Sequence, residues 1–556
     1  MGPIHCQPSY YAVEDGGAKS LYFLSTMTYT MQHYALTVDK FLTHAAKWHG
    51  ASEVVSAMAG AVRRETYARL GEQCNQLSGA LLAQGLQQGD RIATLAWNTV
   101  DHLTMYYAAM SVGMVCHTLN PRLMAAQLAV MVNEAEDRWI AVGGGLQPLL
   151  RELLPHCPTI EGIILLDNQP MEASLSPGHG YWALADFLRQ FGCAVPWGQF
   201  DEQIPAGLCY TSGTIGDPRG VLYTHRSNYL HTLRALQGDA MAITAQDAVL
   251  VAVPMFHANG WGLPFAVPAV GAKMVLPGRS VDPVHLRELI LREEVTVAAA
   301  VPTVWLGLVE LFEKEGGELP FLKRIVIGGS HCADELIVRM ENTLGVMVQT
   351  SWGMTELSPL GTISPPDAPR MEGLRGSGRP VLGLDVKLVD PEGAALEPQR
   401  MVEGRLMVKG ASVAERYFKA EQSALDDEGY FDTGDLAILD EAGTLTITGR
   451  SKDLIKSGGE WINPAAIERV VGSVPGVGLA AVVGCADLKW GERPVLIVEP
   501  RRSHAIEERG LLDALRGKVP DWWIPERVII VERMPLAATG KIDKKQLRAS
   551  LAARPD

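Results

Sequence analysis

A loop rich in glycine and hydroxyl side chains lies at residues 210–221, where the sequence reads YTSGTIGDPRGV. It separates two apolar runs, LCY and VLY, and the second reads as a strand. Unhindered backbone N–H groups, several hydroxyl donors and the charge of Arg219 are groups that bind a polyphosphate. The pattern differs from the GxxxxGK[ST] loop of nucleotide hydrolases, which opens a helix. An ordinary hairpin would have the same composition, and three later motifs decide between the two.

Three further clusters of polar residues follow this loop in order. They are WGMTE at 352–356, YFDTGDLA at 430–437 with GRSKD at 449–453, and PLAATGKIDKKQLR at 535–548. Together the four clusters resemble the motifs of the adenylate-forming superfamily of acyl-CoA synthetases, luciferases and peptide-synthetase adenylation domains. The stretches TLAWN, CHTLNPR, VPMFHANGW and IKSGGEWIN are similar to those of medium- and long-chain fatty acyl-CoA ligases and methylmercaptopropionate ligases. The resemblance covers nearly the whole chain from about Met31 onward.

Such enzymes activate a carboxylic acid with ATP, and the resemblance implies the same chemistry here. A carboxylate is a poor acyl donor because its leaving group would be oxide, whereas transfer of AMP creates a mixed anhydride with a good leaving group. The enzyme must bring two anions together and stabilise charge at phosphorus, which requires positive charge, hydroxyl donors and a metal ion. ATP, Mg²⁺ and coenzyme A are therefore the expected cofactors.

The resemblance assigns catalysis to Lys541, His257, Thr355 and Glu356. Lys541 is expected to bridge the carboxylate and the α-phosphate, which suits a flexible ammonium. Glu356 is the expected Mg²⁺ ligand, since hard cations prefer carboxylate oxygen, and Thr355 would donate to the α-phosphate. His257 would lie beside the reacting carboxylate. Without the resemblance, Lys541 would belong to a solvated basic face and His257 to the core. Thr355 and Glu356 would then form a helix cap.

Nucleotide contacts are expected from Asp435, which would accept from the ribose hydroxyls, and from Arg450, which would support the same sugar. Trp352 would stack against adenine, and glycines at 328 and 329 would allow a close backbone approach. Otherwise Asp435 would be a turn residue and Arg450 a surface charge. The residues expected to bind ATP or coenzyme A are Thr211, Ser212, Gly213, Thr214, Arg219, Gly329, Ser330, Trp352, Gly353, Asp435, Arg450, Lys456, Gly458, Gly459 and Trp461.

Lys452 occupies the position that acts as a hinge in the resembled enzymes. Rotation there after adenylation would bring the loop 457–461, SGGEW, to the acyl-adenylate, and its two glycines would leave room for pantetheine. The glycine pair would also suit a plain turn. Trp261 and Met354 are the expected liners of the acyl pocket, and Trp305 suits either that pocket or the core.

Two residues of the phosphate loop depart from the family pattern. Ile215 stands where relatives usually have Thr, and Arg219 where they have Lys. Ile215 removes one hydroxyl, while Arg219 keeps the charge but prefers bidentate geometry. We expect reduced or retuned activity rather than none.

The elements that must position these residues alternate between short apolar runs and helical patterns. Strands are predicted at 90–95, 139–142, 248–253, 273–276, 296–300, 325–327 and 346–349, with helices at 102–113 and 283–293. Such alternation predicts layered parallel α/β sheets. Beyond Gly376 the strands alternate in polarity, which predicts a small barrel-like or antiparallel subdomain. Residues 449–453 resemble a linker, and a helix is expected to start at Asn463-Pro464.

The predicted organisation is a mobile extension at 1–30, with Met27 or Met31 as alternative starts, an adenylation domain at 31–450 and a mobile α+β lid at 451–556. The 556 residues exceed one typical domain. A net charge of −14 argues against a nucleic-acid partner. Eight scattered cysteines without CxxC spacing indicate reduced thiols, and no apolar run suits a membrane span. A cytoplasmic location is expected, and the resemblance suggests a homodimer.

The sequence thus predicts an AMP-forming carboxylate–CoA ligase, acting on a medium- or long-chain fatty acid or another largely apolar acid. Arylalkanoate, steroid-side-chain and methylthioalkanoate acids are the alternative substrates. A degenerate acyl-adenylate-binding protein and a luciferase-like oxygenase are rival functions. A peptide-synthetase module is disfavoured, because no Asp lies near Met255 and no carrier domain follows Lys541. GSGRPV at 376–381 lacks the third glycine of a dinucleotide fingerprint.

Overall fold

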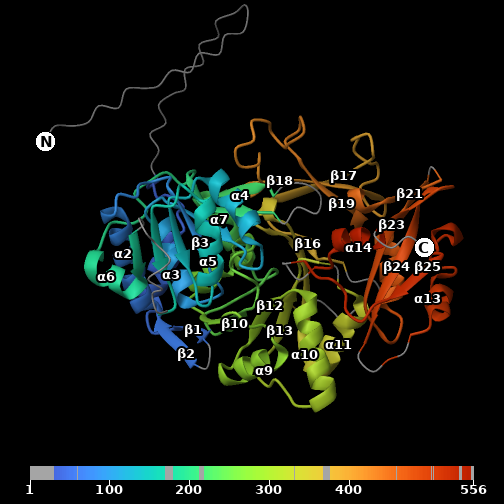
Figure 1. Ribbon diagram of the computed structural model, residues 1–556, viewed down its shortest axis with the longest axis horizontal. Helices are drawn as coiled ribbons and strands as arrows, with labels where there is room; N and C mark the ends of the chain where they lie inside the picture. The colour runs from blue at the N-terminus through green and yellow to red at the C-terminus, as the bar shows by residue number, and fades with distance from the viewer. Residues whose placement is uncertain are drawn as a thin grey trace, which may run out of the picture. The chain divides into compact units, whose positions relative to one another are not determined.

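The computed structural model describes residues 31–58, 61–168, 180–211, 218–330, 332–366, 376–458, 460–501, 504, 506–537 and 541–552. The expected N-terminal extension, 1–30, lies outside these residues. From Leu36 onward the chain forms one compact unit by its contacts. The described strands build four sheets with helices packed on their faces, so the predicted α/β architecture is confirmed (Figure 1).

One sheet is parallel from β14 to β1 and antiparallel at both edges. Its strands in spatial order are β16 (Arg379–Pro380), β15 (Leu360–Ile363), β14 (Met347–Gly353), β13 (Arg324–Ile327), β12 (Val297–Ala300), β10 (Ala248–Val251), β11 (Lys273–Leu276), β1 (Glu53–Met58) and β2 (Ala61–Thr66). The strands predicted at 248–253, 273–276, 296–300 and 325–327 are confirmed. β14 starts one residue later than predicted and runs on through Gly353, so that the WG of WGMTE is part of the strand.

A second sheet is parallel except for its last strand, β9. Its order is β7 (Gly180–Ala183), β6 (Gly162–Leu165), β5 (Trp139–Val142), β3 (Arg91–Leu95), β4 (Val115–Leu119), β8 (Pro205–Tyr210) and β9 (Gly220–Thr224). The strands predicted at 90–95 and 139–142 are confirmed.

The helices in the described residues are α1 (Asp39–Trp48), α2 (Tyr67–Ala83), α3 (Val100–Met110), α4 (Ala125–Ala135), α5 (Gln147–Leu153), α6 (Leu184–Phe191), α7 (His225–Ala235), α8 (Leu263–Ala269), α9 (Pro283–Arg292), α10 (Pro302–Glu315), α11 (Asp334–Leu344), α12 (Pro464–Gly472), α13 (Glu508–Leu515) and α14 (Lys544–Ala552).

Alternation along the strands gives each parallel sheet two apolar faces. On β3, Ile92 enters the core shared with α1, α2, α3 and α8, whereas Ala93 faces a separate core with α4 and α5. The other sheet packs its second face against α9, α10 and α11, which lie beside β12 and β13 in Figure 1. Trp305 is fully buried in this last core, so it belongs to the core rather than to an acyl pocket.

Asn98 joins the two parallel sheets at the ends of β3 and β10. Its amide nitrogen donates to the carbonyls of Val251 and Val253 at 2.9 and 2.7 Å, and its oxygen accepts from the Met255 N–H at 2.8 Å. All of these groups are buried, where an unmade hydrogen bond costs about 1–3 kcal/mol. Asn98 therefore fixes the backbone that leads into the His257 segment.

The region after Gly376 forms an antiparallel sheet in the order β17 (Leu384–Val389), β18 (Glu403–Gly410), β19 (Phe431–Leu439) and β20 (Leu445–Arg450). The antiparallel prediction for this region is confirmed. The linker predicted at 449–453 is wrong for its first two residues. Gly449 pairs with Leu436 and Arg450 with Asp435 in the β19–β20 ladder, and Arg450 also forms an ion pair with Asp435.

Beyond Arg450 the chain builds a sheet of its own. It comprises β22 (Glu460–Ile462), β21 (Ile455–Ser457), β24 (Gly491–Pro500), β23 (Val477–Asp487) and β25 (Arg527–Ile530). α12 and α13 pack on one face and α14 on the other. α12 starts as predicted, with Pro464 first and the Asn463 side chain accepting from the Ala465 N–H. A boundary at 450–451 stays a prediction. Among the described residues, no helix is long and apolar enough to cross a bilayer.

Glu293 closes the end of the first sheet through a buried ion cluster. Its carboxylate is fully buried and contacts Arg64 at 2.7 Å, Lys273 at 2.9 Å and Arg292 at 3.0 Å. Burial alone would raise the pKa of Glu293, but hydrogen bonds from these three cations outweigh it and lower the pKa to about 2. The cluster ties β2, β11 and the end of α9 together.

Replacing Glu293 by Gln is expected to cost about 3 kcal/mol at neutral pH, because three cations lose their shared anion. The folded pKa lies below the unfolded value, so the contribution is present above about pH 4.3 and is lost as the pH falls toward 2. Thermal unfolding of Glu293→Gln beside Glu315→Gln, a surface partner of Arg287, at pH 7 and pH 3 measures this. Equal midpoints for Glu293→Gln and the parent at pH 7 would contradict it.

Candidate active site

The predicted phosphate loop joins β8 to β9 in an antiparallel hairpin. The Thr211 N–H donates to the Arg219 carbonyl at 2.9 Å and closes the base of the loop. Ser212, Gly213, Thr214 and Ile215 lie outside the described residues. Thr211 and Arg219 therefore flank the loop, as the sequence suggested, and their phosphate-binding role stays a prediction.

Tyr417 links Arg219 to Glu356. The Arg219 guanidinium carbon lies 5.0 Å from the centroid of the Tyr417 ring, and the Tyr417 hydroxyl donates to Glu356 Oε1 at 2.7 Å. Burial and the charge of Glu356 raise the pKa of Tyr417, so the phenol keeps its proton at neutral pH. We did not predict Tyr417 from the sequence; its only signal is an aromatic residue between charged ones in ERYFKA.

Thr355 and Glu356 begin a short 3-10 turn, Thr355–Leu357, one residue after β14. Neither serves as a side-chain helix cap in the described structure, which removes that alternative. The Tyr223 hydroxyl donates to the Thr355 carbonyl at 2.8 Å, and the Ala414 N–H donates to the Glu356 carbonyl at 2.8 Å. Both side chains are buried. These two hydrogen bonds hold the backbone of the turn.

Asp435 connects β14, β19 and β20 through its carboxylate. Arg450 Nε, directly across the ladder, lies 2.8 Å from Oδ1, and the indole N–H of Trp352 donates to Oδ2 at 2.9 Å. Asp435 lies within β19 and only 2% of it is exposed, so it is not a turn residue. Arg450 is an exposed charge, as its alternative held, but it is paired with Asp435. Each carboxylate oxygen has a second lone pair that can accept a further hydroxyl. The roles of Asp435 at ribose and of Trp352 at adenine stay predictions.

Lys541 lies in the same electrostatic neighbourhood as Asp435, Arg450, Glu356 and His257. Burial and the positive charge of Arg450 lower the pKa of Lys541, and the carboxylates of Asp435 and Glu356 raise it. The net result is a pKa of about 8. Its amine has no ion pair within 4 Å among the described residues. Burial, and then the charge of Lys541, lower the pKa of His257 to about 4, so its imidazole is neutral at pH 7. The structure therefore gathers two cations, two carboxylates and a neutral imidazole from distant parts of the sequence.

The segment after His257 forms a left-handed turn, Ala258–Gly262. Backbone φ is positive at each of these residues, including Asn259 at 50° and Trp261 at 58°. Left-handed geometry costs a residue with a side chain about 1–2 kcal/mol, so surrounding contacts must hold it. The Trp261 ring lies against Gly328 and Gly329, where an added Cβ would approach it to 3.3 and 3.4 Å. Trp261 thus contacts the predicted nucleotide-binding glycines, next to the half-buried Ser330.

Met354 is half-buried against the main core and precedes the Thr355 turn. A Cβ on Gly353 would lie 2.2 Å from the Pro359 carbonyl oxygen, so only glycine fits there. Lys452 lies in a 3-10 turn, Ser451–Asp453, that directly follows β20. Its hinge role stays a prediction, as does the acyl-pocket role of Met354.

The predicted coenzyme A loop contacts a different part of the chain. Lys456 Nζ lies 5.4 Å from the centroid of the Trp461 ring, and the Gly458 N–H donates to the Trp490 carbonyl at 2.7 Å. Gly459 lies outside the described residues. Within the described chain, no hydrogen bond or ion pair joins Lys456, Gly458 or Trp461 to Lys541. About half of Trp461 is exposed, so this loop faces solvent.

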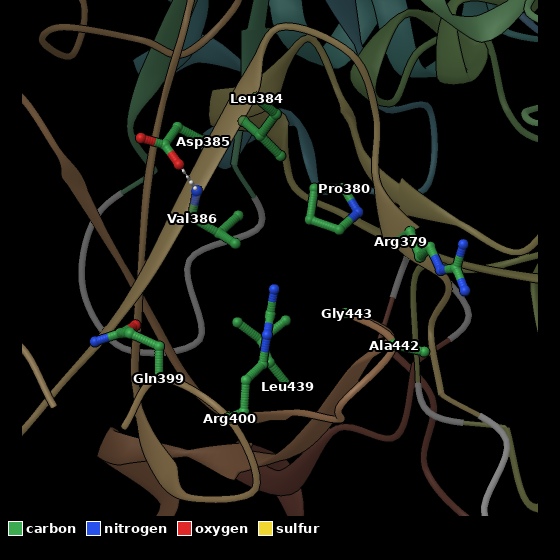
Figure 2. A pocket seen from close by; sticks show the side chains of 10 residues that line it. All are labelled: Arg379, Pro380, Leu384, Asp385, Val386, Gln399, Arg400, Leu439, Ala442 and Gly443. Atoms are coloured by element: carbon green, nitrogen blue, oxygen red, sulfur yellow. Dashed lines mark hydrogen bonds between the residues drawn. The ribbon is translucent and has the colours of Figure 1, made fainter. Parts of the chain in front are cut away.

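A hollow of about 410 Å³ lies beside the antiparallel sheet, and Figure 2 shows Arg400 directed into it. Its lining residues are Arg379, Pro380, Leu384, Asp385, Val386, Gln399, Arg400, Leu439, Ala442 and Gly443. None of them is a predicted site residue, so this hollow is separate from the candidate active site.

Two family models match the chain. The AMP-binding enzyme family matches residues 41–418, and the AMP-binding enzyme C-terminal domain matches residues 466–541. The first spans more than half of the chain and contains Arg219, His257, Glu356 and Tyr417. The second ends at Lys541.

Similar proteins cover almost the whole chain. A 3-methylmercaptopropionyl-CoA ligase of Ruegeria pomeroyi is 38% identical over 93% of this chain and 98% of its own length. A medium-chain-fatty-acid–CoA ligase of Ectopseudomonas oleovorans is 39% identical over 93% of this chain and 96% of its own. The crystal structure of ATP-bound MatB from Rhodopseudomonas palustris superposes with a TM-score of 0.79 at 26% identity, over 92% of this chain and 99% of MatB.

The amine of Lys541 is expected to titrate near pH 8, because burial and Arg450 disfavour its charge. Glu356→Gln is expected to lower that pKa further, since the Glu356 carboxylate stabilises the ammonium. Reductive ¹³C-methylation and NMR titration measure both values, and the signal is assigned by its loss in Lys541→Arg. A Lys541 pKa in the ordinary lysine range would contradict the arrangement described here.

Proposed function

The chain belongs to the family of AMP-binding enzymes, and on that basis we propose that it is an ATP-dependent carboxylate–CoA ligase. In the first step the carboxylate attacks the α-phosphate of ATP, forming acyl-AMP and releasing pyrophosphate. In the second step the thiol of coenzyme A attacks the acyl carbonyl and releases AMP. The similar proteins from Ruegeria pomeroyi and Ectopseudomonas oleovorans carry CoA-ligase names, which supports this activity.

The observation that carries the proposal is the position of the Lys541 amine, which is partly buried near Glu356, Asp435 and Arg450 but paired with none of the described residues. An unpaired cation in a partly desolvated site interacts strongly with a developing negative charge. We assign to Lys541 the bridging of carboxylate and α-phosphate. With a pKa near 8, its amine is mostly charged at pH 7.

His257 is neutral at pH 7, because burial and Lys541 disfavour its protonation. A neutral imidazole can lie beside a substrate carboxylate without neutralising it as an ion pair would. We assign His257 to positioning of the acid and Thr355 to donation toward the α-phosphate. The fixed backbone of the Thr355–Leu357 turn means that neither step requires that segment to reorganise.

The residues near Glu356 fit a magnesium ion that arrives with the triphosphate. Mg²⁺ binds through one or two carboxylates plus substrate phosphates rather than in an all-protein cage. Tyr417 fixes one oxygen of Glu356 and leaves the other for a ligand, and no cluster of three acidic, histidine or cysteine ligands occurs in the described residues. When bound, Mg²⁺ would neutralise phosphate charge, and Glu356 would hold it.

We propose a largely apolar acid as the substrate, of the medium- or long-chain fatty type. The relatives' names include a medium-chain fatty acid and 3-methylmercaptopropionate, both apolar beyond the carboxylate. Trp261, lying over Gly328 and Gly329 near the His257 segment, supplies an apolar surface. Arylalkanoate, steroid-side-chain and methylthioalkanoate acids remain the alternatives that the same surface would accept, and the name of the Ruegeria pomeroyi relative supports the last of these.

For the thioester step we propose that residues 451–556 rotate about Lys452 and bring Lys456, Gly458, Gly459 and Trp461 to coenzyme A. The half-exposed position of Trp461 supports this, because the contacts described for this loop are with Lys456 and Trp490 and not with Lys541. On the same resemblance we also propose that the protein forms a homodimer and is located in the cytoplasm.

The stacking of Arg219 on Tyr417 bears on the rival function, a degenerate acyl-adenylate-binding protein. A guanidinium lies flat on an aromatic ring, whereas lysine is a compact point charge. The Tyr417 ring thus gives the exposed Arg219 side chain a cation–π contact that suits a guanidinium. This favours a retuned phosphate loop over a disabled one.

Pyrophosphate release from MgATP tests the proposal, using fatty acids of graded chain length and several aryl acids with and without coenzyme A. One acid class is expected to trigger release, and its thioester is expected to form when coenzyme A is present. Lys541→Ala should lower the release rate by about 100- to 1,000-fold, as loss of one well-placed donor does. Lys545→Ala, in the neighbouring exposed turn of α14, is the matched control and should match the parent.

ATP binding without acid-dependent pyrophosphate release would favour the adenylate-binding alternative. In that case Ile215→Thr with Arg219→Lys distinguishes a disabled loop, which the double change would restore, from an acid absent from the panel. Oxygen consumption with acyl-AMP would instead identify a luciferase-like oxygenase.

A further inference from the structure

Arg234 is a buried cation without an acidic partner. It lies in the last turn of α7, only 5% of it is exposed, and no carboxylate among the described residues lies within 4 Å. Its Nε has no hydrogen-bond partner in the described structure. Burying an unpaired charge is costly, and a well-packed apolar side chain would often serve stability as well or better. The role of Arg234 is therefore inferred from the hydrogen bonds that it makes.

Those contacts are two backbone carbonyls of the segment that follows Glu356. One terminal nitrogen of Arg234 donates to the Leu357 carbonyl at 3.0 Å and to the Leu360 carbonyl at 2.6 Å. His231, one helical turn earlier on the same face of α7, accepts from the Leu360 N–H at 3.2 Å. Two side chains of one helix thus hold both ends of residues 357–360.

The same segment is connected to the Glu356 turn at its other side. The Met354 N–H donates to the Pro359 carbonyl at 3.1 Å, and the Leu357 N–H donates to the Met354 carbonyl at 3.0 Å. A shift of 357–360 would therefore move Met354, and with it the backbone on both sides of Glu356. His231 also touches the left-handed turn, since a Cβ on Gly262 would lie 2.5 Å from its ring.

We propose that Arg234, together with His231, is a positioning residue that holds Glu356 where magnesium-bound triphosphate needs its carboxylate. The inference rests on the proposed function for the identity of that ligand. Arg234 acts through the backbone and touches no reacting atom, so it sets the affinity of the metal–nucleotide complex. Groups that orient metal ligands typically change metal affinity by about 10- to 100-fold when removed.

The test is calorimetric binding of α,β-methylene-ATP, which cannot release pyrophosphate, with saturating Mg²⁺ and with EDTA. The parent is expected to bind the analogue more tightly with Mg²⁺. Arg234→Met should reduce this Mg²⁺-dependent tightening by about 10-fold or more while leaving metal-free binding unchanged. Arg234→Lys, which keeps a donating cation, should retain most of it.

Arg226→Met is the matched control, because Arg226 lies on the same helix and pairs with Glu202 at 2.6 Å near the surface. It should leave the tightening unchanged. If Arg234→Met does not fold, Arg234→Gln replaces it, since its shorter amide cannot reach both carbonyls.

Equal Mg²⁺-dependent tightening in the parent and in a folded Arg234→Met or Arg234→Gln variant would overturn the inference, as would an equal loss with and without Mg²⁺. A parent that binds the magnesium analogue but consumes oxygen with acyl-AMP and forms no thioester would overturn the ligase proposal alone, because the binding comparison needs no turnover. A parent that binds no analogue would overturn both.

Discussion

The buried Asp435 carboxylate is the interaction on which the candidate site depends. It accepts from Trp352 at the end of a mainly parallel sheet and from Arg450 across an antiparallel ladder, so it joins two sheets of different type. A buried carboxylate needs charged or polar partners, because desolvation otherwise favours its neutral, protonated form. The same negative charge, with that of Glu356, raises the pKa of Lys541 against the effects of burial and Arg450. Structural and electrostatic roles are therefore carried by one side chain.

The site is also organised by hydrogen bonds to backbone groups. The carbonyls of Thr355, Glu356, Leu357 and Leu360 accept from groups on α7, β9 and the segment after β18. Fixing each of these residues costs conformational entropy during folding rather than during the reaction. Tyr417 and Arg219 add a ring stack and a hydrogen bond to the Glu356 side chain. A rigid carboxylate of this kind suits a metal that demands regular geometry.

Much of the fold was predictable because strand and helix periodicities are local properties. The strands at 139–142 and 273–276 and the start of α12 at Pro464 follow directly from apolar runs and capping residues. The errors arose where pairing extends an element. Gly449 and Arg450 read as a linker, yet cross-strand pairing with Leu436 and Asp435 draws them into β20. β14 continues into WGMTE because β15 pairs with it.

By itself, the sequence determined the family and the order of the motifs. It also singled out Lys541, Glu356, Asp435 and Arg450 as candidate site residues, because each motif is a short, contiguous stretch of sequence. Only the tertiary structure decided that Tyr417 lies between Arg219 and Glu356 and that Arg234 supports the Leu357 and Leu360 carbonyls. It also decided that Trp305 belongs to the core. The hydrogen-bond partners of Tyr417 and Arg234 lie 61 or more positions away, and no local pattern in the sequence shows which distant groups folding will bring together.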